Sequence, residues 1–166
     1  VFDPSDVEAL YIKFSNLCNF KCVMCGAGSS HLIAKEQNWS TPLSEINDFY
    51  ETQLLDLLPQ MTNLRHVQIT GGEPLLHKKK NLDFLSKLSK DVKIQYRTNG
   101  SIYDNEVTDF LKTFDTVHFL TSIDGQEDVL HYQRPRSEWN VIEENLKQYK
   151  DKGFTIINTM TVTSFN

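Results

Sequence analysis

Strand-like and helix-like segments alternate along this chain, and the alternation limits the folds that it can adopt. Alternating apolar residues mark the strands, and apolar residues at three- and four-residue intervals mark the helices between them. Strands joined by helices in this way form right-handed βαβ units and a parallel sheet. The expected strands are 11–15, a segment around Val67 and Ile69, a segment around Ile94 and Tyr96, 117–120 and 155–163.

The expected helices have apolar stripes and recognisable ends. Thr41 and Pro42 match an N-cap followed by proline at the first helical position, and Pro59 ends the helix that they begin. Gly153 suits the C-terminal cap of the last helix. The expected helices are 31–38, the long helix that begins at Thr41, and three around 82–88, 107–114 and 139–149.

Composition favours a globular protein and argues against several classes of function. The 166 residues suit a single domain, 1–166. A net charge of -5 argues against a nucleic-acid-binding protein. No apolar run approaches the roughly 20 residues of a membrane span, and no signal segment begins the chain, so no membrane association is expected.

All three cysteines of the chain, Cys18, Cys22 and Cys25, lie in one short stretch after the first strand. An odd number of clustered cysteines suits a reducing cytoplasm better than a disulfide framework. Three thiolates are one ligand short of a closed zinc site. One alternative is a zinc-stabilised binding module in which His31 completes a Cys3His site. The other is an iron–sulfur cluster with one iron open to an outside ligand.

Glycine and polar residues gather directly after the later strands as well. The ligand-binding edge of a parallel α/β fold lies at the carboxyl ends of its strands, so these segments are expected to meet there. The segments are Gly71-Gly72-Glu73-Pro74 after the second strand, Thr98-Asn99-Gly100 after the third and Ser122-Ile123-Asp124-Gly125 after the fourth.

Together these motifs resemble those of the radical S-adenosylmethionine (radical SAM) enzymes. The C-x3-C-x2-C spacing matches the family signature, and Gly71-Gly72-Glu73-Pro74 matches its GGEP motif. The motifs after the third and fourth strands, with Arg134 downstream, lean toward the subgroup that carries a C-terminal SPASM or twitch extension. The chain departs from the family at Met24, where an aromatic residue near the adenine is common, but a thioether can also pack against an adenine.

The resemblance implies a fold, two cofactors and a reaction. The fold is a partial (β/α)6 radical-SAM-type barrel, here ending after its fifth strand. The cofactors are a [4Fe-4S] cluster on the three cysteines and S-adenosyl-L-methionine, which chelates the open iron. Reductive cleavage then gives a 5′-deoxyadenosyl radical that takes hydrogen from the substrate. A flavodoxin or ferredoxin is the implied electron donor, and the subgroup implies a peptide or protein substrate.

The resemblance also assigns roles to individual residues. Glu73 offers a carboxylate to the cofactor's ammonium group. Ser122 and Asp124 offer acceptors to a ribose diol or an ammonium, and Arg134 suits a carboxylate, with Arg136 as a rival. The glycines allow the backbone to approach a ligand closely. The residues expected to bind cofactor are Phe20, Met24, Gly71, Gly72, Glu73, Asn99, Ser122, Asp124 and Arg134, beside the metal ligands Cys18, Cys22 and Cys25.

Overall fold

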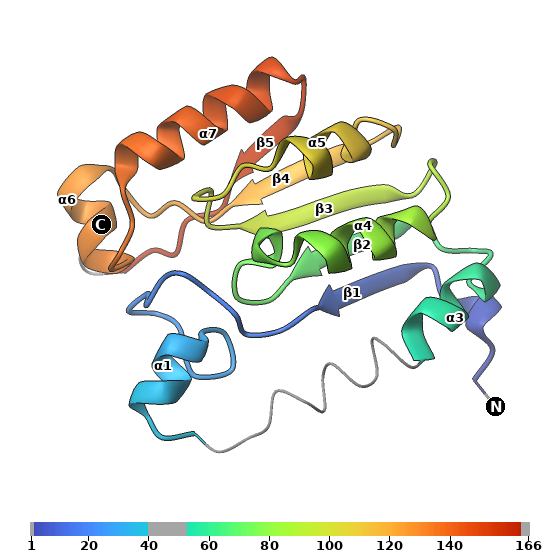
Figure 1. Cartoon of the computed structure of the whole chain (residues 1–166), viewed down its shortest axis with the longest axis horizontal. Helices are drawn as coiled ribbons and strands as arrows, with labels where there is room; N and C mark the ends of the chain where they lie inside the picture. The colour runs from blue at the N-terminus through green and yellow to red at the C-terminus, as the bar shows by residue number, and fades with distance from the viewer. Residues whose placement is uncertain (1, 40–52, 164–166) are drawn as a thin grey trace.

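A single parallel sheet forms the centre of the computed structural model, which describes residues 2–39 and 53–163 (Figure 1). Its strands are β1 (Ala9–Lys13), β2 (His66–Thr70), β3 (Lys93–Thr98), β4 (Val117–Thr121) and β5 (Thr155–Asn158). They lie side by side in the order of the sequence, and every pair is parallel. A sequential order without a reversal is that of a (β/α) barrel, not of a doubly wound sheet. The predicted partial barrel is therefore confirmed.

Helices and short 3-10 turns connect the strands. The helices are α1 (His31–Glu36), α3 (Leu55–Leu57), α4 (Lys78–Ser86), α5 (Asn105–Leu111), α6 (Glu127–Gln133) and α7 (Trp139–Asp151). The 3-10 turns are η1 (Pro4–Asp6), η3 (Leu58–Gln60) and η4 (Pro74–Leu76). Within the described residues, no helix is long and apolar enough to cross a membrane.

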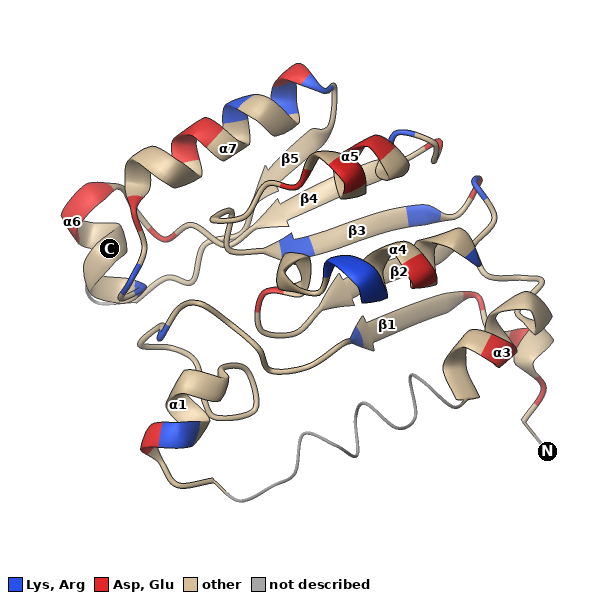
Figure 2. Cartoon of the chain, viewed as in Figure 1, with Lys and Arg blue, Asp and Glu red and all other residues tan. Residues whose placement is uncertain are grey.

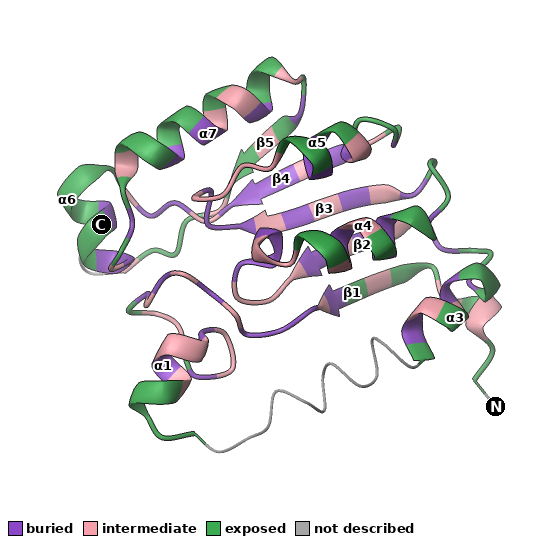
Figure 3. Ribbon diagram, in the orientation of Figure 1, coloured by how far each residue is buried: buried purple, intermediate pink, exposed green. Residues whose placement is uncertain are grey.

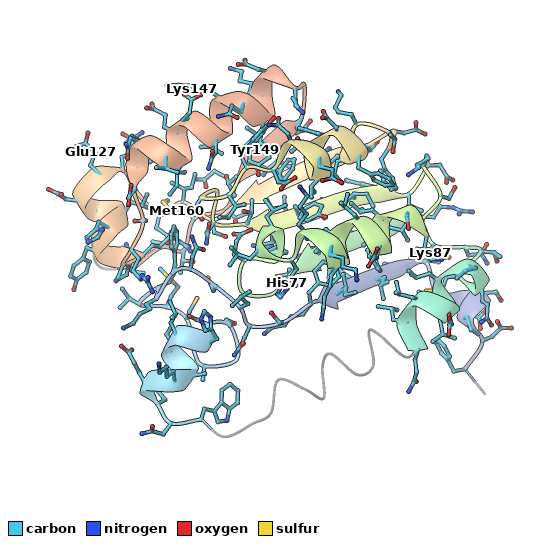
Figure 4. All side chains as sticks on the ribbon, in the orientation of Figure 1. His77, Lys87, Glu127, Lys147, Tyr149 and Met160 are labelled. Atoms are coloured by element: carbon cyan, nitrogen blue, oxygen red, sulfur yellow. The ribbon has the colours of Figure 1, made fainter. Side chains whose placement is uncertain are left out.

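The main core lies between one face of the sheet and the helices α4, α5 and α7. Alternate strand residues such as Val67, Ile94 and Phe119 are fully buried in this core (Figure 3). Tyr149 points from α7 toward the sheet, where its ring stacks on Phe119 with centroids 4.1 Å apart (Figure 4). Its hydroxyl donates to the Ile102 carbonyl at 2.6 Å. The polar end of this buried ring is thus satisfied, as buried tyrosines require.

Several boundaries differ from the sequence prediction. Strand β1 ends at Lys13 and not at 15, and α6 was not predicted because only Leu130 and Gln133 are buried in it. Strand β5 ends at Asn158, not at 163. The Asn158 side chain accepts from the Ile123 N–H at 3.1 Å and donates to the Ile123 carbonyl at 3.0 Å, so it replaces the next rung of the backbone ladder.

The long helix predicted to begin at Thr41 falls partly on residues 40–52, which lie outside the described residues. Its described end agrees with the prediction, because α3 ends at Leu57 and Pro59 lies in the 3-10 turn η3 that follows. Proline cannot continue an α-helix without losing a backbone hydrogen bond.

Candidate functional site

The loop after β1 carries the three cysteines and is held by its own side chains. Cys18 and Cys22 are buried, and Cys25 is half-buried. The Asn16 side chain donates to the Ala27 carbonyl at 2.9 Å, which closes the loop across the cysteine stretch. Phe20, only 1% exposed, packs in a second small core with residues of α6 and α7. The predicted cofactor residue Phe20 therefore anchors the loop from behind.

The turn after β2 packs against this loop through two backbone hydrogen bonds. The Gly72 N–H donates to the Ser15 carbonyl at 3.1 Å, and the Glu73 N–H donates to the Leu17 carbonyl at 2.8 Å. A Cβ added to Gly72 would lie 2.1 Å from the Leu17 carbonyl oxygen, and Gly71 has φ +133. Both glycines are thus required for the close contact between two protein segments, a reason independent of any ligand.

The Glu73 carboxylate is fully buried and joins the turns after β2 and β3. It accepts from the Leu75 N–H at 3.1 Å, from the Asn99 N–H at 2.8 Å and from the Thr98 hydroxyl at 2.9 Å. Desolvation raises the pKa of Glu73 to about 7 despite these donors. The carboxylate therefore holds Asn99 in place from behind.

The Asn99 side chain then joins the turn after β3 to the cysteine loop. Its amide nitrogen donates to the Asn19 side chain at 3.0 Å and lies 4.0 Å from the Cys18 sulfur. Its amide oxygen accepts from the Ser101 N–H at 2.9 Å. Glu73, Asn99 and Cys18 thus form a continuous chain of contacts across three strand ends.

A buried ion pair lies on the other side of the cysteines. Arg134 Nε lies 2.7 Å from Asp124 Oδ2, and the two side chains are 8% and 0% exposed. Arg134 Nη1 donates to the Cys22 sulfur at 3.5 Å. Asp124 Oδ1 accepts from the Thr161 N–H at 2.7 Å. The rival Arg136 is exposed and lines a different hollow, so of these two arginines it is Arg134 that contacts a cysteine.

These segments surround one cavity of about 260 Å³ at the carboxyl ends of the strands. The residues predicted from the sequence that line it are Cys18, Cys22, Met24, Cys25, Gly71, Gly72, Asn99, Ser122 and Arg134. Phe20, Glu73 and Asp124 lie behind this lining and are almost completely buried. The structure thus brings together side chains from the ends of four strands, as expected for a ligand site in such a fold.

Three lining residues, Ser29, Thr70 and Arg97, were not expected from the sequence, whereas Thr161 belongs to the polar run 158–163, one face of which was expected to line a cavity. Thr70 and Arg97 alternate with the core residues Ile69 and Tyr96, so they belong to the opposite face of the sheet. Strand alternation predicts that face, and with the parallel register it identifies which residues reach the cavity.

The surroundings of the three thiols shift their pKa values in different directions. Burial raises the pKa of Cys18. A hydrogen bond between Cys22 and Cys25 raises the pKa of Cys22 and lowers that of Cys25. Metal or cluster binding requires thiolates, so it would release protons from Cys18 and Cys22.

The donor set suits an iron–sulfur cluster better than a single zinc ion. Among residues 2–39 and 53–163, no three His, Cys, Asp or Glu side chains are placed around a common point for a metal ion, and this holds for the three cysteines as well, so the comparison rests on the chemistry of the donors. His31 Nδ1 accepts from the Cys18 N–H at 3.2 Å and so faces the backbone. Three soft thiolates beside a cavity, with N–H donors at Cys18 and Cys22, match the ligation and the sulfur hydrogen bonds of a cluster.

Comparison with known families agrees with this arrangement. The sequence model of the radical SAM superfamily matches residues 12–166. This chain belongs to the radical SAM superfamily. Members of the superfamily bind a [4Fe-4S] cluster and S-adenosylmethionine, which are the two cofactors that the motifs predicted.

Two curated relatives of this radical SAM chain are longer than it is. An uncharacterized protein of Methanocaldococcus jannaschii is 29% identical over 126 residues, which are 73% of this chain and 40% of the relative. The GTP 3′,8-cyclase of Helicobacter pylori is 27% identical over 167 residues, covering 96% of this chain and 49% of the cyclase. The chain therefore spans about half or less of the length of these relatives.

Solved radical SAM structures share the fold. The structure of native anSMEcpe with bound AdoMet has a TM-score of 0.69 and 19% identity, and covers 95% of this chain and 44% of the solved chain. Streptococcus suis SuiB bound to its precursor peptide SuiA has a TM-score of 0.65 and 17% identity, covering 94% and 34%. Both matches include all but a few residues of the chain, so the barrel segment is common to them.

Replacing Glu73 by glutamine is expected to change how the stability of this radical SAM domain depends on pH. The folded pKa of about 7 lies above the ordinary 4.5, so the folded state holds the proton more tightly. Protonated Glu73 therefore adds up to about 3 kcal/mol to the free energy of unfolding below pH 4.5. This contribution is lost as the pH rises through about 7, the folded pKa. Urea unfolding of the metal-free, reduced protein at several pH values measures this.

The glutamine variant lacks the titrating group, so its unfolding free energy is expected to vary less over the same pH interval. Glu106→Gln on the exposed side of α5 serves as the control and should retain the wild-type slope. Parallel pH profiles for the wild type and the Glu73 variant would contradict a raised pKa at this position.

Proposed function

We propose that the protein is a radical SAM enzyme in which Cys18, Cys22 and Cys25 hold a [4Fe-4S] cluster and the adjoining cavity holds S-adenosylmethionine. One observation carries the proposal: the three thiols line the same cavity as the glycine turn after β2, Asn99, Ser122 and Arg134. A set of polar groups from separate strand ends, facing three clustered thiols, suits a cosubstrate that must lie against the cluster.

When bound, the cluster supplies one electron to the sulfonium of S-adenosylmethionine, which yields the 5′-deoxyadenosyl radical that abstracts hydrogen. The protein's residues position the cosubstrate. Arg134 offers a guanidinium to its carboxylate, while Asp124 holds that guanidinium at 2.7 Å. The Ser122 N–H donates to the Thr98 carbonyl at 2.9 Å, which positions Ser122 so that its hydroxyl can bind the cosubstrate. Met24 offers an apolar surface to the adenine of the cosubstrate. Asn99 is fixed beside Cys18 by Glu73.

The partners belong to the same proposal. A one-electron donor such as a flavodoxin or ferredoxin reduces the cluster, and reduced cysteines suit the cytoplasm. We propose a peptide or protein substrate, as in the SPASM or twitch subgroup. The fold match to SuiB, which is solved with its precursor peptide, supports this class.

The test is anaerobic reconstitution of the full-length protein with iron and sulfide, followed by dithionite and S-adenosylmethionine. The wild type is expected to bind four irons per protein, as a [4Fe-4S] cluster requires, and to release 5′-deoxyadenosine. Cys22→Ala is expected to lose both. Val23→Ala is the matched control in the same loop, because the Val23 side chain is 62% exposed. A colourless wild type with one zinc, or a full cluster that yields no 5′-deoxyadenosine, would refute the proposal.

A further inference from the structure

The strands of this acidic protein carry positive charge only. The chain has a net charge of -5, yet β1 to β5 contain no Asp or Glu (Figure 2). Their charged residues are Lys13, Lys93 and Arg97, and His66 and His118 lie on the strands as well. Each of these five residues is a sequence neighbour of a core residue, so all belong to the face opposite the helices. That face therefore attracts anions.

Arg97 is the member of this set that reaches the cavity. It lies on β3, one residue after the fully buried Tyr96, and lines the cavity together with the three cysteines. Its side chain is half-buried. Its guanidinium makes one long hydrogen bond, 3.4 Å from Nη1 to the Thr159 hydroxyl. Within the described residues, no carboxylate forms an ion pair with it.

The two arginines of the cavity therefore differ in charge balance. Arg134 is neutralised by Asp124 at 2.7 Å, whereas Arg97 keeps a net positive charge. A half-buried cation costs desolvation free energy that an anionic partner offsets. Hydroxyl side chains share this part of the site: the Thr159 hydroxyl lies 3.4 Å from Arg97 Nη1, and Thr70 and Thr161 line the same cavity as Arg97. A guanidinium in a cavity that also offers hydroxyls is a suitable arrangement for carboxylate or phosphate oxygens.

We propose that Arg97 binds an anionic group of the substrate, a carboxylate or a phosphate, and so selects an anionic substrate. This inference rests on the proposed function, because the substrate must enter the cavity that holds the cysteines. The anion on Arg97 fixes one end of the substrate on β3, and a carbon nearer the cysteines is then presented for hydrogen abstraction. Arg97 is a binding residue in this scheme and takes no part in proton or electron transfer.

The test uses the reconstituted, full-length protein saturated with S-adenosylmethionine. Isothermal titration calorimetry measures the binding of two probes, glutarate for a carboxylate and inorganic phosphate for a phosphate. The wild type is expected to bind at least one probe, and the tighter probe identifies the anion. Arg97→Gln is expected to weaken that binding roughly tenfold or more, as loss of a charged hydrogen-bond donor does. Arg65→Gln is the matched control, because Arg65 is exposed, does not line the cavity, and its guanidinium donates to the Thr62 and Leu64 carbonyls.

Affinity for S-adenosylmethionine, measured in the same variants, separates the two anions that the cavity can receive. Arg97→Gln is expected to change it less than about twofold. A loss of S-adenosylmethionine affinity in this variant would overturn the proposal, because Arg97 would then bind the cosubstrate's own carboxylate. Equal probe binding by wild type and variant, or none by the wild type, would also overturn it. If the protein forms no cluster but still binds a probe through Arg97, the proposed function is refuted and the anion site at Arg97 is retained.

Discussion

Replacing Gly72 by alanine is expected to separate the cysteine loop from the turn after β2 and to abolish cluster binding. The new Cβ would lie 2.1 Å from the Leu17 oxygen, 2.5 Å from the Leu17 carbonyl carbon and 2.8 Å from the Asn16 carbonyl carbon. These are backbone atoms, so no side-chain rotation relieves the overlap. The backbone hydrogen bonds from Gly72 and Glu73 to Ser15 and Leu17 fix the two segments at this separation.

The expected loss of stability is at least about 3 kcal/mol, the upper end of ordinary overpacking, because both segments would have to move. Such a loss is a large part of the 5–15 kcal/mol that typically holds a domain together. Urea unfolding and iron content after reconstitution measure the two effects. Gly26→Ala is the matched control, since a Cβ there meets nothing within 4 Å. A Gly72 variant that retains wild-type iron content and stability would contradict the described contact.

Local patterns predicted the fold because they depend on neighbouring residues only. The alternation through Val67 and Ile69 identifies a strand, and glycine and polar residues after it identify the ligand-binding edge. The sequential strand order does not follow from these patterns, because a doubly wound sheet has the same alternation of strands and helices, and it was implied by the resemblance to the radical SAM enzymes. The expectation that strand ends meet at one edge placed Cys18 and Asn99 together although they are far apart in the sequence, whereas Arg134 was a candidate through the resemblance.

Partners of individual side chains depend on the tertiary structure and were not predictable. Glu73 was expected to meet an ammonium, and the structure gives it backbone and hydroxyl donors from the turn after β3. Its contact with cofactor stays a prediction. The pairing of Arg134 with Asp124 joins two motifs that the sequence presents separately. Arg97 was not predicted because it lies within β3 and not in the segment after it. Its alternation with the buried Tyr96 nevertheless puts it on the face of the sheet that reaches the cavity.

Replacing Arg134 by glutamine is expected to destabilise the folded protein by about 3–5 kcal/mol, the usual cost of breaking a buried ion pair. The variant would leave the Asp124 carboxylate, 0% exposed, without the guanidinium 2.7 Å away. The Thr161 N–H still donates to the Asp124 carboxylate, but a neutral N–H group does not balance the negative charge of that carboxylate. Because the Cys22 sulfur also loses a donor at 3.5 Å, a shift in the cluster's reduction potential is expected as well.

A double-mutant cycle separates the ion pair from the loss of packing. Arg134→Gln combined with Asp124→Asn removes both charges, so the double variant is expected to be more stable than Arg134→Gln alone. Urea unfolding of the wild type, the two single variants and the double variant gives the coupling free energy. Arg136→Gln, two residues away and exposed, is the control and should lie within about 0.5 kcal/mol of the wild type. Additive effects of the two substitutions would show that Arg134 acts on the cysteine loop without Asp124, and the pair would lose its assigned role of holding that guanidinium at the cavity.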